Sequence, residues 1–153
     1  MRLDLGCGLF KKDNFVGVDI FDFSNKYKKD EFICSMIPDI LETFEDNSVE
    51  EVYASHFIEH IPQYLVINTF NEIYRILIPN GIFEIFVPPT TGRGAFCDPT
   101  HVSFWNDMSF QYYDKTWKFN ELSESYGIRT NFEILKNELI SELNLHVILK
   151  GVK

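Results

Sequence analysis

The sequence has no long apolar run, and its three cysteines include no Cys-x-x-Cys pair. The first absence excludes a membrane-spanning helix of ordinary length. The odd number and wide spacing of Cys7, Cys34 and Cys97 argue against a disulfide framework and predict reduced thiols in a cytoplasmic protein. The first residues, MRLDLGCG, also show no signal-peptide pattern.

Basic residues are scarce as well. Fourteen Lys and Arg oppose 23 Asp and Glu, which leaves a formal net charge of −9. Such a protein repels phosphate backbones, so we expect no nucleic-acid partner and consider a cationic ligand more suitable. Aromatic residues, in contrast, are abundant, with fifteen Phe and seven Tyr. The 153 residues show no repeat or linker, so we expect a single domain over 1–153 with a sizeable core.

Short apolar runs alternate with turn signals along the chain. A helix is predicted where apolar residues recur at helical spacing between a first proline and a closing Pro-Asn-Gly. The predicted strands are Arg2–Leu5, Phe15–Ile20, Glu31–Cys34, Val49–Ser55, Ile82–Val87 and a closing hairpin of Phe132–Leu139 with Asn144–Val152, and the predicted helices are Pro62–Ile78 and two short ones near Met108–Tyr113 and Phe119–Tyr126.

Alternating strands and crossovers predict an α/β fold with a mostly parallel sheet of about seven strands and a final antiparallel hairpin. Two crossovers, Cys7–Asn14 and Phe21–Asp30, are too short for a full helix. We also expect no helix before the first strand. One face of the sheet should therefore be sparsely covered, and we predict a homodimer formed over or beside that face.

The strongest chemical signal is the segment LDLGCG followed by VGVDI. Gly6 and Gly8 allow close approach of backbone to a ligand where the first strand ends, and Asp19 at the end of the second can accept hydrogen bonds from two ribose hydroxyls. A tight turn beside a surface aspartate would give the same pattern. A nicotinamide or nucleotide-sugar enzyme is disfavoured because Lys11 occupies the third glycine position of the dinucleotide motif.

A second motif, His56-x-x-Glu59-His60, has the form of an inverted zinc-protease motif. Pro62 follows at once and no third ligand is apparent in the sequence, so we expect no metal.

Four segments in order are RLDLGCG, VGVDIF, FEDNSVEEVYASHFIEHIP and RILIPNGIFEIFVP. Together they resemble the motif set of class I S-adenosylmethionine-dependent methyltransferases, most closely the methyltransferase type 11 group. Within it the chain is similar to short members that carry a later Asp-Pro-Thr-His, here Asp98–His101. The resemblance implies a Rossmann-like sheet that binds S-adenosylmethionine.

The resemblance also implies roles for individual residues. Gly6 to Gly8 would line the methionine moiety above Asp4, Asp19 would hold the ribose, and Ser55 to Phe57 would close over the methyl group. The cofactor-binding residues expected in this way are Asp4, Gly6, Cys7, Gly8, Asp19, Ile20, Ser35, Met36, Ser55, His56 and Phe57. The sequence departs from the family at Ser35, where Asp is frequent, and at Phe10, which replaces a further glycine.

A hydroxyl acceptor would need a base, for which histidine has a suitable pKa. His101 is the first candidate, because it follows the fifth strand on the ligand side, and His56 is the second. His101 could instead be a loop residue that hydrogen-bonds Asp98. We therefore expect a methyltransferase for a small-molecule or sugar-like acceptor, and the alternative is a protein that binds the cofactor without catalysis.

Overall fold

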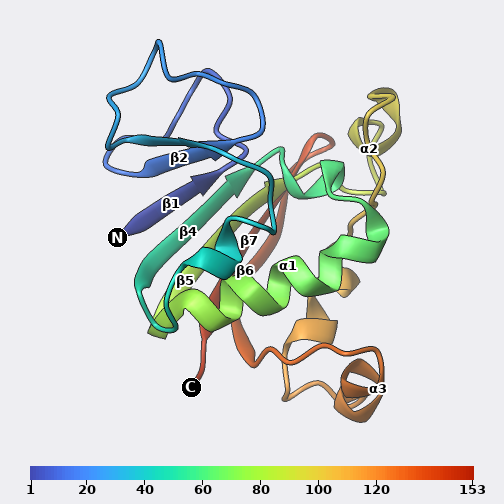
Figure 1. Cartoon of the computed structure of the whole chain (residues 1–153). Helices are drawn as coiled ribbons and strands as arrows, with labels where there is room; N and C mark the ends of the chain where they lie inside the picture. The colour runs from blue at the N-terminus through green and yellow to red at the C-terminus, as the bar shows by residue number, and fades with distance from the viewer.

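The computed structural model describes residues 1–153 and contains one seven-stranded sheet (Figure 1). The strand order across the sheet is β3-β2-β1-β4-β5-β7-β6. The strands are β1 Arg2–Leu5, β2 Val16–Asp19, β3 Phe32–Cys34, β4 Val49–Ser55, β5 Leu77–Val87, β6 Phe132–Ser141 and β7 Asn144–Gly151. The predicted fold class is confirmed.

Strands β1 to β5 pair in parallel, whereas β7 is antiparallel to both β5 and β6. Strand β1 has β2 on one side and β4 on the other, so the direction in which the sheet is built reverses there. In open α/β sheets, ligands bind beyond the carboxyl ends of the strands at such a reversal. The topology therefore places the ends of β1, β2 and β4 around the expected site.

Helical structure is sparse, and α1, Gln63–Ile76, is the one long helix. Neither the Cys7–Asn14 nor the Phe21–Asp30 crossover contains a helix, as predicted. The shorter segments are the 3₁₀ turns η1 Leu41–Thr43, η2 Ile58–His60 and η3 Asp107–Tyr113 and the helices α2 Gly94–Cys97 and α3 Asn120–Ser125. None of the helices is both long and apolar enough to cross a membrane.

The boundary between α1 and β5 differs from the prediction. The helix ends at Ile76 rather than Ile78, and β5 begins at Leu77 rather than Ile82. Pro79 disfavours helical geometry at the residue before it, and Leu77 pairs with Val49 of β4. The segments η1, η2 and α2 were not predicted, because three or four residues are too few to show a helical period.

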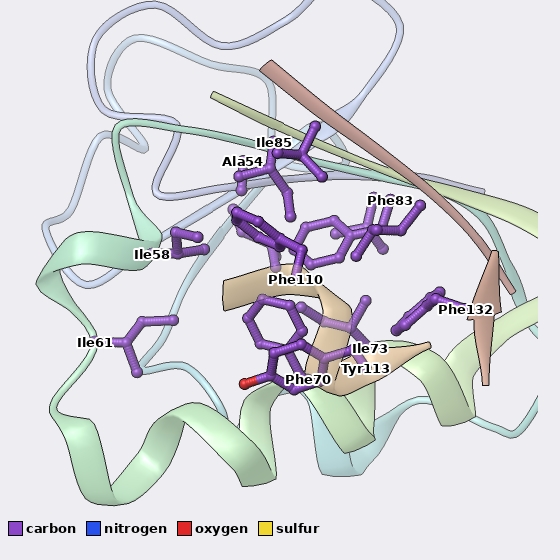
Figure 2. Close-up of a cluster of buried hydrophobic side chains, with 14 of the residues drawn as sticks. Ala54, Ile58, Ile61, Phe70, Ile73, Phe83, Ile85, Phe110, Tyr113 and Phe132 are labelled. Atoms are coloured by element: carbon purple, nitrogen blue, oxygen red, sulfur yellow. The ribbon is translucent and has the colours of Figure 1, made fainter. Parts of the chain in front are cut away.

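The apolar core lies between the sheet and α1 (Figure 2). Phe70 of α1 stacks on Tyr113 with ring centroids 4.1 Å apart and meets Phe83 of β5 edge-on at 5.4 Å. Trp105 stacks on both Phe70 and Phe110, which ties the connection after β5 to the same face. Part of the aromatic richness of the sequence is thus used in packing one face of the sheet, whereas other aromatic residues, such as Phe10 and Tyr64, are exposed.

The opposite face has no helical layer. Along β4, β5 and β7, buried residues alternate with half-buried ones, as expected for a sheet that is fully covered on one side only. Lys12, from the Cys7–Asn14 loop, donates to Glu84 Oε2 at 2.8 Å, and His146 Nε2 lies 2.9 Å from Glu84 Oε1. Burial alone would raise the pKa of Glu84, but these two hydrogen bonds lower it. An ion-paired network therefore occupies this face.

Candidate active site

A cavity of about 620 Å³ lies beyond the carboxyl ends of β1, β2 and β4. Its volume is within the range of small-molecule and cofactor sites. Seven of the eleven predicted cofactor residues line it, namely Gly6, Asp19, Ile20, Ser35, Met36, His56 and Phe57. The other four, Asp4, Cys7, Gly8 and Ser55, do not. The cavity is therefore formed by segments that are distant in the sequence, such as the ends of β1 and β4.

Gly6 forms the floor of this cavity where β1 ends. Its φ is +67°, and its N–H donates to Val18 O at 2.8 Å. A Cβ at this position would lie 2.3 Å from Cδ2 of Phe57, so the Phe57 ring packs directly on the glycine backbone. Both the backbone conformation and the close contact require glycine here.

Asp19, at the end of β2, is almost fully buried, and both of its carboxylate oxygens accept backbone hydrogen bonds. Gly8 N–H donates to Oδ2 and Phe21 N–H donates to Oδ1, each at 2.9 Å. The carboxylate thus joins the glycine loop to the end of β2 and is held rigidly at the cavity wall. Its remaining lone pairs can accept from a bound hydroxyl.

Asp4 and Cys7 support the glycine loop from beneath. Asp4 is buried and accepts a hydrogen bond of 2.6 Å from the backbone N–H of Lys12. Burial raises the pKa of Asp4 to about 6, and burial likewise raises the pKa of the Cys7 thiol to about 12. Cys7 is therefore an inert buried thiol, and Asp4 fixes the path of the loop.

His56 lies on the opposite wall, directly after β4, with a φ of +51°. Its Nε2 is 2.8 Å from Asn144 Oδ1, and its Nδ1 faces Glu59 Oε1 at 3.4 Å. The Glu59 carboxylate raises the pKa of His56 above its ordinary value. His56 is thus a polar residue at the cavity surface whose orientation is fixed from both sides.

His101 does not line the cavity, but it lies behind its wall. Its Nδ1 is 3.0 Å from Ala95 O, and its Nε2 is 4.0 Å from Glu59 Oε1. The side-chain hydrogen bond to Asp98 considered above is absent, because Asp98 Oδ1 accepts from Thr100 N–H and Oγ1 instead. His101 is nevertheless bonded to Asp98 through the backbone, since its N–H donates to Asp98 O at 3.2 Å.

Three residues near this wall were not predicted as part of the site. Glu59 is 1% exposed, and His60 and Thr100 line the cavity. The imidazole rings of His60 and His101 meet edge-on with centroids 4.9 Å apart. The His56-x-x-Glu59-His60 motif could have drawn attention to Glu59 and His60, but their proximity to His101 depends on the tertiary fold.

Comparison with known families decides the classification. The model described as "Methyltransferase domain", of the type 11 group, matches residues 3–85, which is more than half of the chain. The chain belongs to the type 11 methyltransferase family. This membership confirms the resemblance described above and the expected cofactor, S-adenosylmethionine. The match includes the glycine loop, Asp19 and His56 of this methyltransferase domain, but it stops before His101.

Curated relatives of this methyltransferase domain include the sterol 24-C-methyltransferases of Clavispora lusitaniae and Debaryomyces hansenii. Each is 28% identical over 102 residues, and the matched part covers 55% of this chain. It covers only 27% and 26% of those two proteins, so the chain spans about a quarter of the length of the curated relatives it matches.

Solved structures show the same fold. A S-adenosylmethionine-dependent methyltransferase from Archaeoglobus fulgidus superposes with a TM-score of 0.68 at 18% identity, covering 98% of this chain and 85% of that one. The 1,6-didemethyltoxoflavin-N1-methyltransferase of Burkholderia thailandensis gives 0.65 at 14% identity, covering 99% and 71%. That structure contains 1,6-didemethyltoxoflavin and S-adenosylhomocysteine.

Proposed function

We propose that this protein transfers the methyl group of S-adenosylmethionine to a small-molecule or sugar-like acceptor. The observation that carries the proposal is the cavity of about 620 Å³, with Gly6 at its floor and Asp19 at its wall. The didemethyltoxoflavin bound to one structural relative and the phosphoethanolamine bound to another support a small acceptor.

The chain's own residues would act mainly by binding and orientation. Gly6 exposes backbone to the methionine part of the cofactor, Asp19 accepts from the ribose hydroxyls, and Ile20 and Met36 offer apolar surface to the adenine. The bound cofactor supplies a sulfonium methyl group. Transfer of that methyl group to the acceptor would leave S-adenosylhomocysteine in the cavity. Placing the acceptor in line is the principal contribution of the protein.

For a hydroxyl acceptor, we propose that His56 or His101 removes the acceptor proton. His56 is better placed for contact, since it lines the cavity, whereas His101 lies behind Glu59. The uncovered face that was expected to form a homodimer carries the ion-paired network of Lys12, Glu84 and His146. The homodimer and the cytoplasmic location both stay predictions.

The experiment that tests the proposal is calorimetric titration with S-adenosylhomocysteine. Asp19→Ala removes the carboxylate that would accept from the ribose, so we expect its dissociation constant to rise about tenfold to 150-fold. Asp22→Ala is the matched control, because Asp22 is an exposed neighbour that does not line the cavity. Thermal denaturation verifies that each variant is folded.

Equal affinities of the wild type and a folded Asp19→Ala variant would contradict the ribose assignment. Tight binding of the cofactor without turnover on any acceptor in a panel would instead support the alternative, a cofactor-binding protein without catalysis.

A further inference from the structure

A buried carboxylate without a hydrogen-bond partner lies beside the cavity. Glu59, in η2, is 1% exposed, and neither of its carboxylate oxygens has a hydrogen-bond partner. Leaving an ionised carboxylate buried in this way is unfavourable, and native proteins rarely do so without a functional reason or a bound ion. His56 Nδ1 faces Oε1 at 3.4 Å, but Oε2 still needs a positive or hydrogen-donating partner.

Three imidazoles approach this carboxylate: His56 Nδ1 lies 3.4 Å from Oε1, and His60 and His101 lie close to it as well. The hydrogen bonds of His60 and His101 define their tautomers. His101 Nδ1 lies 3.0 Å from the Ala95 carbonyl, which can only accept. His60 Nδ1 lies 3.3 Å from Thr100 O and 3.1 Å from Thr100 Oγ1, whose own hydrogen is donated to Asp98. Each neutral ring thus carries its hydrogen on Nδ1 and a lone pair on Nε2.

The lone pair of His101 consequently faces a negative atom. Its Nε2 is 4.0 Å from Glu59 Oε1, a distance too long for a hydrogen bond. A protonated His101 would relieve the repulsion, but it would leave Glu59 Oε2 without a partner. A cation between the three side chains would satisfy the carboxylate and both rings together.

The backbone around Glu59 holds these groups in place. The carbonyl of Glu59 accepts from Val102 N–H at 2.9 Å and from Ser103 N–H at 3.0 Å, and Ser103 Oγ donates to Ile58 O at 2.8 Å. These bonds attach the loop that carries His101 to η2. Such support, together with carbonyl partners for the second ring nitrogen, is typical of histidines that ligate metals.

We propose that Glu59, His60 and His101, here called the histidine cluster, bind one divalent transition-metal ion at the wall of the cofactor cavity. One ligating atom of each residue lies within 4.8 Å of those of the other two. Two imidazole nitrogens and one carboxylate form the ligand set of many catalytic zinc sites, which leave a position open. Imidazole ligands favour zinc and its neighbours over magnesium.

The three ligating atoms must move closer together to hold an ion. Tetrahedral zinc with bonds of about 2.0–2.1 Å separates its ligand atoms by roughly 3.4 Å, whereas His101 Nε2 and Glu59 Oε1 are 4.0 Å apart and the cluster as a whole lies within 4.8 Å. His60 and Thr100 belong to the cavity lining, so the cavity gives access to the cluster. Resting on the proposed function, the open position would take an oxygen of the acceptor, and His56 rather than His101 would then remove its proton, because the ion would occupy His101 Nε2.

The test uses metal-stripped, tag-free protein without any cofactor, so that its result is independent of methyl transfer. Calorimetric titration with Zn²⁺ should show saturable binding of one ion per chain, and Mg²⁺ should bind at least about tenfold more weakly. Glu59→Gln and His101→Gln should each weaken Zn²⁺ binding by at least about tenfold. His146→Gln is the matched control, since His146 also faces a carboxylate, that of Glu84, but on the other face of the sheet.

Co²⁺ provides a second measurement, because its absorption spectrum reports the ligands. Nitrogen and oxygen ligation without a thiolate charge-transfer band supports the histidine cluster. A thiolate band would assign binding to the cysteines and overturn the proposal. Absence of one-to-one binding, or unchanged affinity in folded Glu59→Gln protein, would overturn it equally.

Discussion

The two faces of the sheet are built on opposite principles. On the α1 face, Phe70, Phe83, Phe110 and Trp105 form a dry aromatic cluster whose members are at most 4% exposed. On the other face, side chains from the same strands are half-buried, and polar contacts such as the one between Lys12 and Glu84 hold them in place. Neighbouring residues of one strand thus serve two different environments.

The difference between the two faces shows how a sheet is stable when helices cover only one of its faces. The Cys7–Asn14 loop takes the place of a crossover helix, covering Asp4 and supplying Lys12 as a cation over the Tyr53 ring at 4.1 Å. A charged and aromatic face tolerates partial exposure, whereas an apolar one would favour association. Mutations that affect one face at a time measure how far this division holds.

The largest expected effect concerns two phenylalanines of β5. Phe83 is fully buried against Phe70, whereas Phe86 is half-buried and stacks on His146 with centroids 4.1 Å apart. We expect Phe83→Ala to lower the free energy of unfolding by about 3–5 kcal/mol because it opens a cavity in the core. Phe86→Ala should cost about 1–2 kcal/mol.

Chemical denaturation at micromolar concentration measures both losses. Equal losses would mean that the second face is as deeply buried in solution as the first, for example by a second copy of the chain, and the division between the faces would then be wrong.

A smaller change in the free energy of unfolding is expected at Asp4, which the Cys7–Asn14 loop buries on the second face of the sheet. Its pKa in the folded protein is about 6, above the ordinary value, so the folded state binds the proton more tightly than the unfolded state. The contribution of Asp4 to stability is therefore greatest at low pH and is lost as the pH rises from about 4 through 6. We expect Asp4→Asn to gain stability relative to the wild type over that range, by roughly 2–3 kcal/mol.

Asp22→Asn is the control of opposite sign, because hydrogen bonds from Ser24 lower the pKa of the exposed Asp22 carboxyl. The ionised Asp22 carboxylate stabilises the fold at pH values above the ordinary pKa of aspartate. Asp22→Asn should therefore be less stable than the wild type at those pH values. Chemical unfolding curves at several pH values measure the free energy of unfolding of the wild type and of both variants. A difference between wild type and Asp4→Asn that does not change with pH would show that the loop does not bury Asp4 as described.

Most of the sheet could be predicted from the sequence because its signals are local. The bounds of β1 and β4 were predicted correctly, and the short crossovers followed from residue counts alone. The start of β5 was wrong because the register with β4, which extends the strand back to Leu77, depends on pairing between distant residues. The turns η1 and η2 leave no periodic signal.

The two sides of the cavity also differ in how far they could be predicted from the sequence. Gly6 and Asp19 are separated by one short loop, and their motif is visible in the sequence. Glu59 and His101 are 42 positions apart, and the hydrogen bonds that hold their segments together run from the backbone N–H groups of Val102 and Ser103 to Glu59 O. We expected no metal from the His56-x-x-Glu59-His60 pattern because Pro62 follows it and no third ligand was apparent in the sequence; His101, from this distant loop, completes the proposed cluster.

The most direct test of the account is a crystal structure of the protein with S-adenosylhomocysteine. We expect the ligand in the cavity between Gly6 and Met36, with the ribose hydroxyls donating to Asp19 and the sulfur directed toward His56 and Phe57. A ligand bound elsewhere, or a ribose that does not contact Asp19, would contradict it.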